Sequence, residues 1–221
     1  MPQFYKNSDA KEDSYALRGE NRPTCILFAE GDAEALFLDK WLTIRGDSPN
    51  SVAVICFRGH SNLETILKRF SADPNFEAVE RFGFYLDAEA TGANVRAKAI
   101  AKILGNQGII PAGTSLEPGT LLSVGKKRIA VFVSPDNANP GCIEDVVIKE
   151  IMTTSIAACI TGYRECLAST DTPLHSKGFV QAYLSARNAR LAGTGRGFEA
   201  GVLDVMHPAY APIRDTFSVL L

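Results

Sequence analysis

The sequence predicts an α/β fold built on a mostly parallel sheet, and three observations support this prediction. Short, continuous apolar runs occur at residues 25–29, 52–57, 82–86 and 129–133, as is typical of strands buried on both faces. Segments with apolar residues at helical spacing separate these runs, so strand and helix alternate to about residue 150. Acidic side chains follow three of the strands. The alternation indicates parallel βαβ units with right-handed crossovers.

The first two βα units are the clearest. The apolar run at 25–29 leads into Glu30 and Gly31, and a helix is expected over residues 32–45, because an acid such as Asp32 suits a helix cap or first turn. After a turn, the run at 52–57 leads to a helix that starts near residue 61 and ends before Pro74.

The next elements follow the same pattern. The run at 82–86 ends at Asp87 and precedes a helix over about 95–104. Residues 108–111 predict a further short strand, and the glycine-containing stretch 113–127 predicts a loop or a hairpin ahead of the strand at 129–133. Asp136-Asn137 follows, and its composition favours a turn over a metal-ligand role. A helix then begins near Ile143, with Glu144 and Asp145 in its first turn.

The predicted organisation is a polar lead-in that is loosely held (residues 1–22), an α/β domain (23–150) and a helical extension packed on the same domain (151–221). The extension contains Gly193-Thr194-Gly195-Arg196-Gly197. This composition resembles a phosphate-binding loop, but the segment follows a helix instead of a strand. We therefore interpret it as a flexible connector.

Composition excludes several classes of function. The chain has 221 residues, 46% of them hydrophobic, and a net charge of −2. It therefore lacks the global positive field of a non-specific DNA-binding surface. No apolar run approaches the roughly 20 residues of a membrane span, and the first residues lack the apolar core of a signal peptide, so a cytoplasmic location is expected. Five scattered cysteines and three distant histidines predict neither a disulfide framework nor a zinc site.

Two groups of positively charged residues could either contact a substrate or simply lie on the surface. Arg58 follows the second strand and could face a substrate phosphate, or it could be an ordinary surface arginine. Lys126, Lys127 and Arg128 could contact a phosphate backbone, or they could belong to a solvated loop.

The acids at the strand ends are the candidate site. Glu30 and Glu34 follow the first strand, Asp87 and Glu89 the third, and Glu144 and Asp145 the last. Ligands of parallel sheets bind beyond the carboxyl ends of the strands, so these acids could converge on one edge. Each acid also has a structural alternative, because carboxylates commonly cap helices.

The motifs resemble those of the Toprim fold, which topoisomerases, primases, small RNA-maturation nucleases and OLD nucleases share. That pattern has a strand ending in Glu-Gly with a further acid three residues after the glycine, and a second strand ending in Asp-x-Asp. Glu30-Gly31 with Glu34 matches the first element, and Asp87-Ala88-Glu89 matches the second. Glu89 departs from the pattern, which prefers aspartate there.

More narrowly, the chain looks like a stand-alone Toprim-like family of uncharacterised bacterial and archaeal proteins, over roughly residues 24 to 217. Four short segments carry this likeness: Pro135-Asp136-Asn137, Pro140 to Asp145, Lys177 to Tyr183, and Gly201 to Pro208.

The resemblance implies Mg²⁺- or Mn²⁺-dependent nuclease or phosphodiesterase chemistry on DNA or RNA. It implies that Glu30 is a metal ligand or general acid–base and that Asp87 and Glu89 are the metal-holding catalytic pair. Glu34 with Glu144 or Asp145 would complete a second ion site. An ATPase partner in phage defence is implied as well, and a homodimer is left open.

Two alternatives remain. In one, the chain is a catalytically weak Toprim-like binding module of a protein complex. The other is a receiver-like or flavodoxin-like regulator. That reading would require a lysine at a late strand end, and the strand at 129–133 lacks one.

Overall fold

The computed structural model describes residues 3–6, 23–48, 51–170, 172–188 and 190–221. Its centre is a six-stranded sheet in which every neighbouring pair is parallel except the last. The predicted α/β class with a mostly parallel sheet is therefore confirmed. In spatial order the strands are β1 (Gln3–Lys6), β3 (Val52–Cys56), β2 (Cys25–Ala29), β4 (Arg81–Asp87), β6 (Lys127–Ser134) and β5 (Leu121–Val124).

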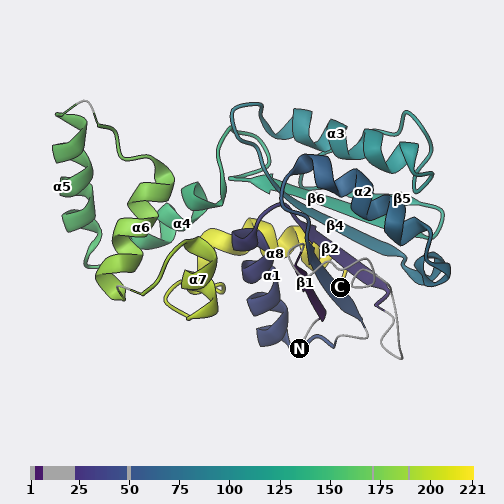
Figure 1. Ribbon diagram of the computed structural model, residues 1–221, viewed down its shortest axis with the longest axis horizontal. Helices are drawn as coiled ribbons and strands as arrows, with labels where there is room; N and C mark the ends of the chain where they lie inside the picture. Colours follow the sequence, from purple (N-terminus) through teal and green to yellow (C-terminus); the bar gives the residue numbers. More distant parts are fainter. Residues whose placement is uncertain (1–2, 7–22, 49–50, 171, 189) are drawn as a thin grey trace.

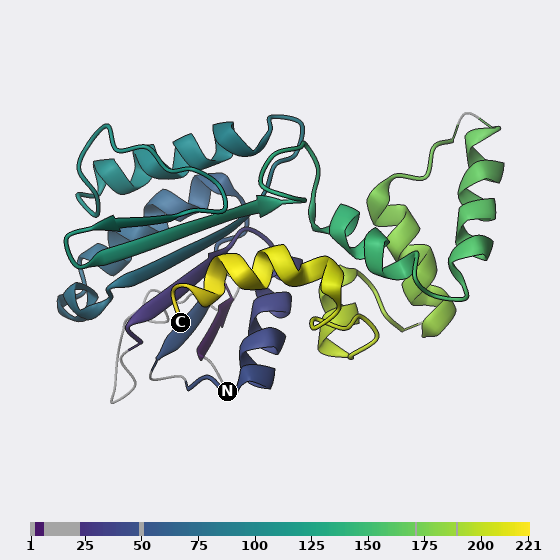
Figure 2. The same cartoon turned by 180° about the vertical axis from the view of Figure 1, so that it is seen from behind.

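Helices cover both faces of the sheet (Figure 1). One face carries α2 (His60–Ser71) and α3 (Ala93–Asn106), whereas α1 (Asp32–Arg45) and α8 (Ala211–Ser218) cover the other. The remaining helices lie beyond the carboxyl ends of the parallel strands, where α5 and α6 project away from the sheet (Figure 2). They are α4 (Ile143–Ile151), α5 (Ala157–Ala168), α6 (Ser176–Arg187) and α7 (Thr194–Glu199), and two short 3-10 turns lie at Pro74–Ala78 and Pro208–Tyr210.

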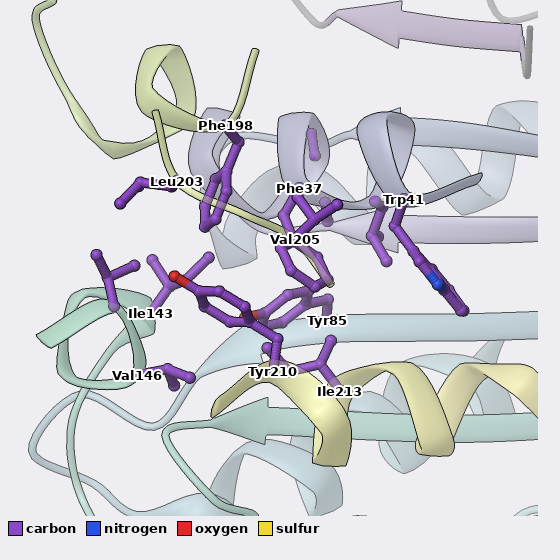
Figure 3. Packing of buried hydrophobic residues seen from close by; sticks show 14 of the residues in the cluster. Phe37, Trp41, Tyr85, Ile143, Val146, Phe198, Leu203, Val205, Tyr210 and Ile213 are labelled. Atoms are coloured by element: carbon purple, nitrogen blue, oxygen red, sulfur yellow. The ribbon is translucent and has the colours of Figure 1, made fainter. Parts of the chain in front are cut away.

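Side chains of the central strands alternate between two buried cores, which is why the strands read as continuous apolar runs. On the α2–α3 side, Phe28 and Phe84 stack with their ring centroids 5.2 Å apart. On the other side, Tyr210 packs 5.2 Å from Phe37 and 5.5 Å from Phe198 (Figure 3). This second core takes residues from α6, α7 and α8 as well as from the sheet.

The strand order places a topological switch point between β2 and β4. The chain moves from β2 to β3 on one side and then returns to β4 on the other side of β2. Helices that follow neighbouring strands consequently lie on opposite faces, which opens a crevice at the carboxyl ends of β2 and β4. Glu30 follows β2 directly and Asp87 ends β4.

Three expectations were wrong, namely those for the start of the chain, for residues 108–111 and for the Gly193–Gly197 segment. Gln3–Lys6 are not a loose lead-in, because they pair with Ala53–Cys56 as a parallel edge strand; residues 1–2 and 7–22 lie outside the described residues. Residues 108–111 form no strand, and their apolar character instead serves burial of Ile109 and Ile110 beneath α3.

The Gly193–Gly197 segment is not a flexible connector. Most of it belongs to α7, which packs closely on α1. A Cβ atom on Gly195 would lie 2.7 Å from Leu36 Cδ1 and 3.0 Å from the Asp32 carbonyl oxygen. Glycine is required here because the two helices pack closely. The prediction of a flexible connector failed because it took the glycines as a sign of flexibility instead of close packing.

None of the helices in the described ranges has both the length and the apolar character needed to cross a bilayer.

Candidate functional site

Glu30 connects the two strands at the switch point. Its backbone N–H donates to the Tyr85 carbonyl at 3.0 Å, and its Oε2 accepts from the backbone N–H of Asp87 at 3.2 Å. The same oxygen forms an ion pair with Arg96 of α3. Both side chains are mostly buried, with 15% of Arg96 and 19% of Glu30 exposed. Glu30 is therefore held facing the crevice by neighbours on both β4 and α3.

Arg96 was missed by reasoning from the sequence. It lies in the first turns of α3, where the positive end of the helix dipole disfavours a cation. A basic residue at such a position is a usable signal that a specific acid faces it.

Asp87 is the most perturbed acid. Its Oδ1 accepts the backbone N–H of Ile143, at the start of α4, at 2.9 Å. Burial, followed by the charges of Glu34, Glu144 and Glu30, raises its pKa from 3.8 to about 9. Asp87 is accordingly protonated at neutral pH in this arrangement.

Glu34 is buried, with 3% of the residue exposed. Its carboxylate turns back over the start of α1, and a Cβ on Gly31 would lie 2.7 Å from Glu34 Oε2. Burial raises its pKa from 4.5 to about 7, and the charges of Glu144 and Glu30 act in the same direction. The Glu-Gly sequence thus provides space for the second acid.

Glu144 joins these residues from the first turn of α4. It is 6% exposed, and its Oε1 accepts from the Thr194 hydroxyl at 2.8 Å. Its Oε2 is buried and has no hydrogen-bond partner among the described residues. Glu150 on the same helix provides a contrast, because its two oxygens accept from Asp204 N–H at 2.9 Å and Tyr210 Oη at 2.5 Å.

The switch point therefore gathers four carboxylates, from Glu30, Glu34, Asp87 and Glu144, that repel one another. Lys177 lies near these acids, and their negative charges, that of Glu144 above all, raise its pKa. The four acids come from the ends of three strands and lie near enough for their charges to interact, but they do not form a group arranged to hold a metal ion.

Asp145 does not join the cluster. Its Oδ2 accepts the backbone N–H of Cys142 at 2.9 Å, and its Oδ1 accepts from the Ser176 hydroxyl. Both oxygens are thus used to cap α4 and to attach the start of α6, which is the structural alternative for this residue.

Glu89 also lies apart. It is exposed and adopts a positive φ of 50°, and its backbone pairs with Gly141. Its side chain lines a cavity of about 440 Å³ together with Lys177. The structure therefore separates the two acids of the Asp-x-Glu motif, with Asp87 in the buried cluster and Glu89 at its rim.

A family model described as "Protein of unknown function (DUF3226)" matches residues 24–221. The chain belongs to the DUF3226 family. No curated protein and no solved structure matches it. The matched span includes all four clustered acids and also Lys177 and Thr194, so the family model covers the helical extension as well as the sheet.

In this DUF3226 chain, the fit to a metal ion can be judged from the acids. Within the described ranges, no group of three or more histidine, cysteine, aspartate or glutamate side chains is arranged to hold a metal ion as it stands. Mg²⁺ needs fewer, because it is commonly held by one or two carboxylates, with water and substrate phosphates completing its shell. The unpartnered Oε2 of Glu144 and the repulsion among the acids suit such a site.

The other charged candidates lie elsewhere. Arg58 donates to both carboxylate oxygens of Asp32, at 3.1 and 3.0 Å, so its charge is already matched. Lys127 begins β6, at the opposite end of that strand from the acids, and donates to the carbonyls of Glu77 and Val79. Asp136 accepts the Asn139 backbone N–H at 2.9 Å, as the turn interpretation requires.

Proposed function

We propose that this protein is a divalent-cation-dependent phosphodiesterase of the Toprim type, acting on DNA or RNA with Mg²⁺ or Mn²⁺. The observation that carries the proposal is the convergence of Glu30, Glu34, Asp87 and Glu144 at the switch point of a parallel sheet. Ligands bind at this place in open α/β sheets. Carboxylates whose pKa is raised by burial and by neighbouring acids, as for Asp87 and Glu34, are also typical of functional sites.

The four acids have different roles in this proposal. Asp87 and Glu30, at adjacent strand ends, would hold the ion, and the nearby charge of Glu34 would strengthen the attraction for a cation. A bound divalent ion supplies Lewis-acid polarisation of the phosphate and a more acidic water. Asp87 would lose its proton as the cation binds, so cation affinity should rise with pH. Glu144 Oε2 is a free acceptor that can orient a water or a ligand hydroxyl.

A second candidate is a non-catalytic module that binds its partner without cleaving it. The observation that favours it is the ion pair between Glu30 and Arg96, which neutralises an acid that the catalytic proposal uses. The exposed position of Glu89, outside the cluster, is consistent with it as well.

Cleavage assays separate these candidates. Purified protein is incubated with labelled single-stranded and duplex DNA and RNA in Mn²⁺, in Mg²⁺ or in EDTA. We expect cation-dependent cleavage, reduced on the order of 100-fold or more in Asp87→Asn and in Glu30→Gln. Glu117→Gln is the matched control, because Glu117 is an exposed acid in the loop before β5. It should cleave like wild type.

If no cleavage is detected, calorimetric titration with Mn²⁺ shows whether the protein binds the cation at all. Cation binding without cleavage would favour the binding module. Absence of both, or equal cleavage by wild type and Asp87→Asn, would overturn the catalytic proposal.

A further inference from the structure

Three neighbouring cavities lie along the helical extension, and two of them are lined by Glu144 of the acid cluster. The first, of about 440 Å³, lies between Glu89, Arg164 and Lys177. The second, of about 330 Å³, shares Lys177 and extends to Glu144. The third, of about 340 Å³, shares Glu144 and reaches Arg196. Because each cavity shares lining residues with the next, we call the series the extension path.

The charges along the extension path come from two parts of the chain. Arg164, Lys177 and Arg196 all belong to the extension, on α5, α6 and α7 respectively. Glu89 and Glu144 come from the α/β part. The Arg164 guanidinium lies 5.1 Å from the centre of the Phe179 ring, which holds it against the wall of the first cavity. Arg196 is ion-paired with Glu199, so Arg164 and Lys177 are the cations of the path that remain for a ligand, beside the acidic edge formed by Glu89 and Glu144.

Glu144 provides an independent sign of a ligand. It lines the second and third cavities, and 6% of the residue is exposed. Its buried Oε2 has no partner in the described part of the chain. Leaving a buried carboxylate oxygen unpaired is costly. Because Glu144 lies beside two cavities, a donor on a bound group could supply the missing partner.

We propose that the extension path holds a single strand of nucleic acid past Glu144, at the edge of the acid cluster, with Arg164 and Lys177 contacting phosphates. This inference rests on the proposed function, since it concerns the substrate of the same site. The cavities lie at the small end of the size range of ligand pockets, so each suits about one nucleotide. Cations that follow the backbone are typical of single-strand sites, and the partly buried side chains of Leu174 and Ile148 add apolar surface to the first cavity.

Local cations are also needed because the chain as a whole is slightly acidic, with a net charge of −2. A cavity of about 330 Å³ along α3, lined by Lys98 and Lys102, shares no lining residue with the three cavities of the path. It is not part of the extension path.

The test measures strand binding by fluorescence anisotropy in EDTA, so that no cleavage occurs. The probes are labelled 12-nucleotide oligo-dT and oligo-U, a duplex of the same length and a labelled mononucleotide. We expect Arg164→Gln and Lys177→Gln each to weaken single-strand binding on the order of 10-fold. Each should also reduce the slope of log affinity against log salt by about 0.7.

Arg187→Gln is the matched control. Arg187 stacks on Tyr183 at 5.4 Å, as Arg164 does on Phe179, but it lines none of the three cavities. It should bind like wild type. Lys177→Arg keeps the charge and should restore most of the affinity lost in Lys177→Gln. Thermal unfolding of each variant shows whether a loss of binding comes from a loss of fold.

The outcomes distinguish this inference from the proposed function. Wild-type affinity in both Arg164→Gln and Lys177→Gln overturns the path, even when Mn²⁺-dependent cleavage is intact. Equal affinity for duplex, or for the mononucleotide, overturns the single-strand assignment. Selective loss of strand binding in the two variants supports the path even if no cleavage is found, in which case the proposed function alone fails.

Discussion

Replacing Asp87 by asparagine should stabilise the protein, and increasingly so as pH rises. Asparagine keeps an oxygen that can accept the Ile143 N–H, which lies 2.9 Å from Asp87 Oδ1, but it carries no charge. The aspartate has a pKa of about 9 in the folded protein, because it is buried beside Glu34, Glu144 and Glu30, against 3.8 when unperturbed. Ionisation of Asp87 therefore favours the unfolded chain.

The sign follows from the number of protons bound by each state. Below pH 3.8 Asp87 is protonated in both states, and it costs nothing. As pH rises towards 9 the unfolded chain loses the proton while the folded protein keeps it, so folding stability falls. A difference of one bound proton changes the free energy of unfolding by about 1.4 kcal/mol per pH unit. Between pH 5 and pH 8 the loss of stability is therefore at most about 4 kcal/mol. Half of that, about 2 kcal/mol, is our expectation, because interacting acids share their protons.

Urea unfolding in EDTA at pH 5, 6, 7 and 8 measures this difference. The free energy of unfolding of Asp87→Asn should exceed that of wild type by an amount that grows with pH, whereas Glu117→Gln should show no such trend. Millimolar Mn²⁺ should narrow the gap, because an ion that binds only the folded wild type stabilises it by about 2.7 kcal/mol at 100 times its Kd. A constant difference across this pH range would refute the electrostatic reasoning.

Two further predictions concern packing and pairing. Arg96→Gln should destabilise the protein by roughly 3 kcal/mol, because it leaves Glu30 mostly buried and without its cation; the double variant with Glu30→Gln should recover most of this in urea unfolding, and additive losses would contradict the pairing. Gly195→Ala should lower stability by about 1–3 kcal/mol through its clash with Leu36. Gly162→Ala in α5, where a Cβ meets nothing within 4 Å, should raise stability by up to about 1 kcal/mol. Thermal unfolding of both alanine variants measures the two changes. Equal effects of the two alanines would contradict the packing argument.

The central strands could be predicted because burial on both faces leaves a continuous apolar signal. β2 and β3 begin and end within a residue of the predicted limits, and β4 and β6 extend them by one or two residues. The edge strands leave no such signal. Gln3–Lys6 is partly polar, and Leu121–Val124 is half exposed. At 108–111 the opposite error occurred, because apolar residues that serve burial were interpreted as a strand.

The site could be predicted only as far as strand ends determine it. Glu30 and Asp87 follow from their position after buried strands. Arg96 pairs with Glu30 across 66 residues, and Thr194 contacts Glu144 across 50. These contacts between residues far apart in the sequence depend on how α3 and α7 pack against the sheet. The periodicity of apolar residues does not encode that packing. The two uses of acids after the last strand, Asp145 as a cap and Glu144 in the cluster, differ by a single position in one helical turn.

A purely structural role explains some of the acids and leaves others unexplained. Asp145 caps α4, and Glu150 has both oxygens satisfied by protein donors. Glu144, by contrast, buries an oxygen without a hydrogen-bond partner among the described residues. Burial, together with the charges of neighbouring carboxylates, raises the pKa of Asp87 and that of Glu34. An amide in place of Asp87 would satisfy the same backbone donor without this electrostatic cost. A buried arrangement of acids that contributes nothing to folding is the kind of instability that proteins retain where a ligand compensates for it, and this is the role that the proposed cation would have.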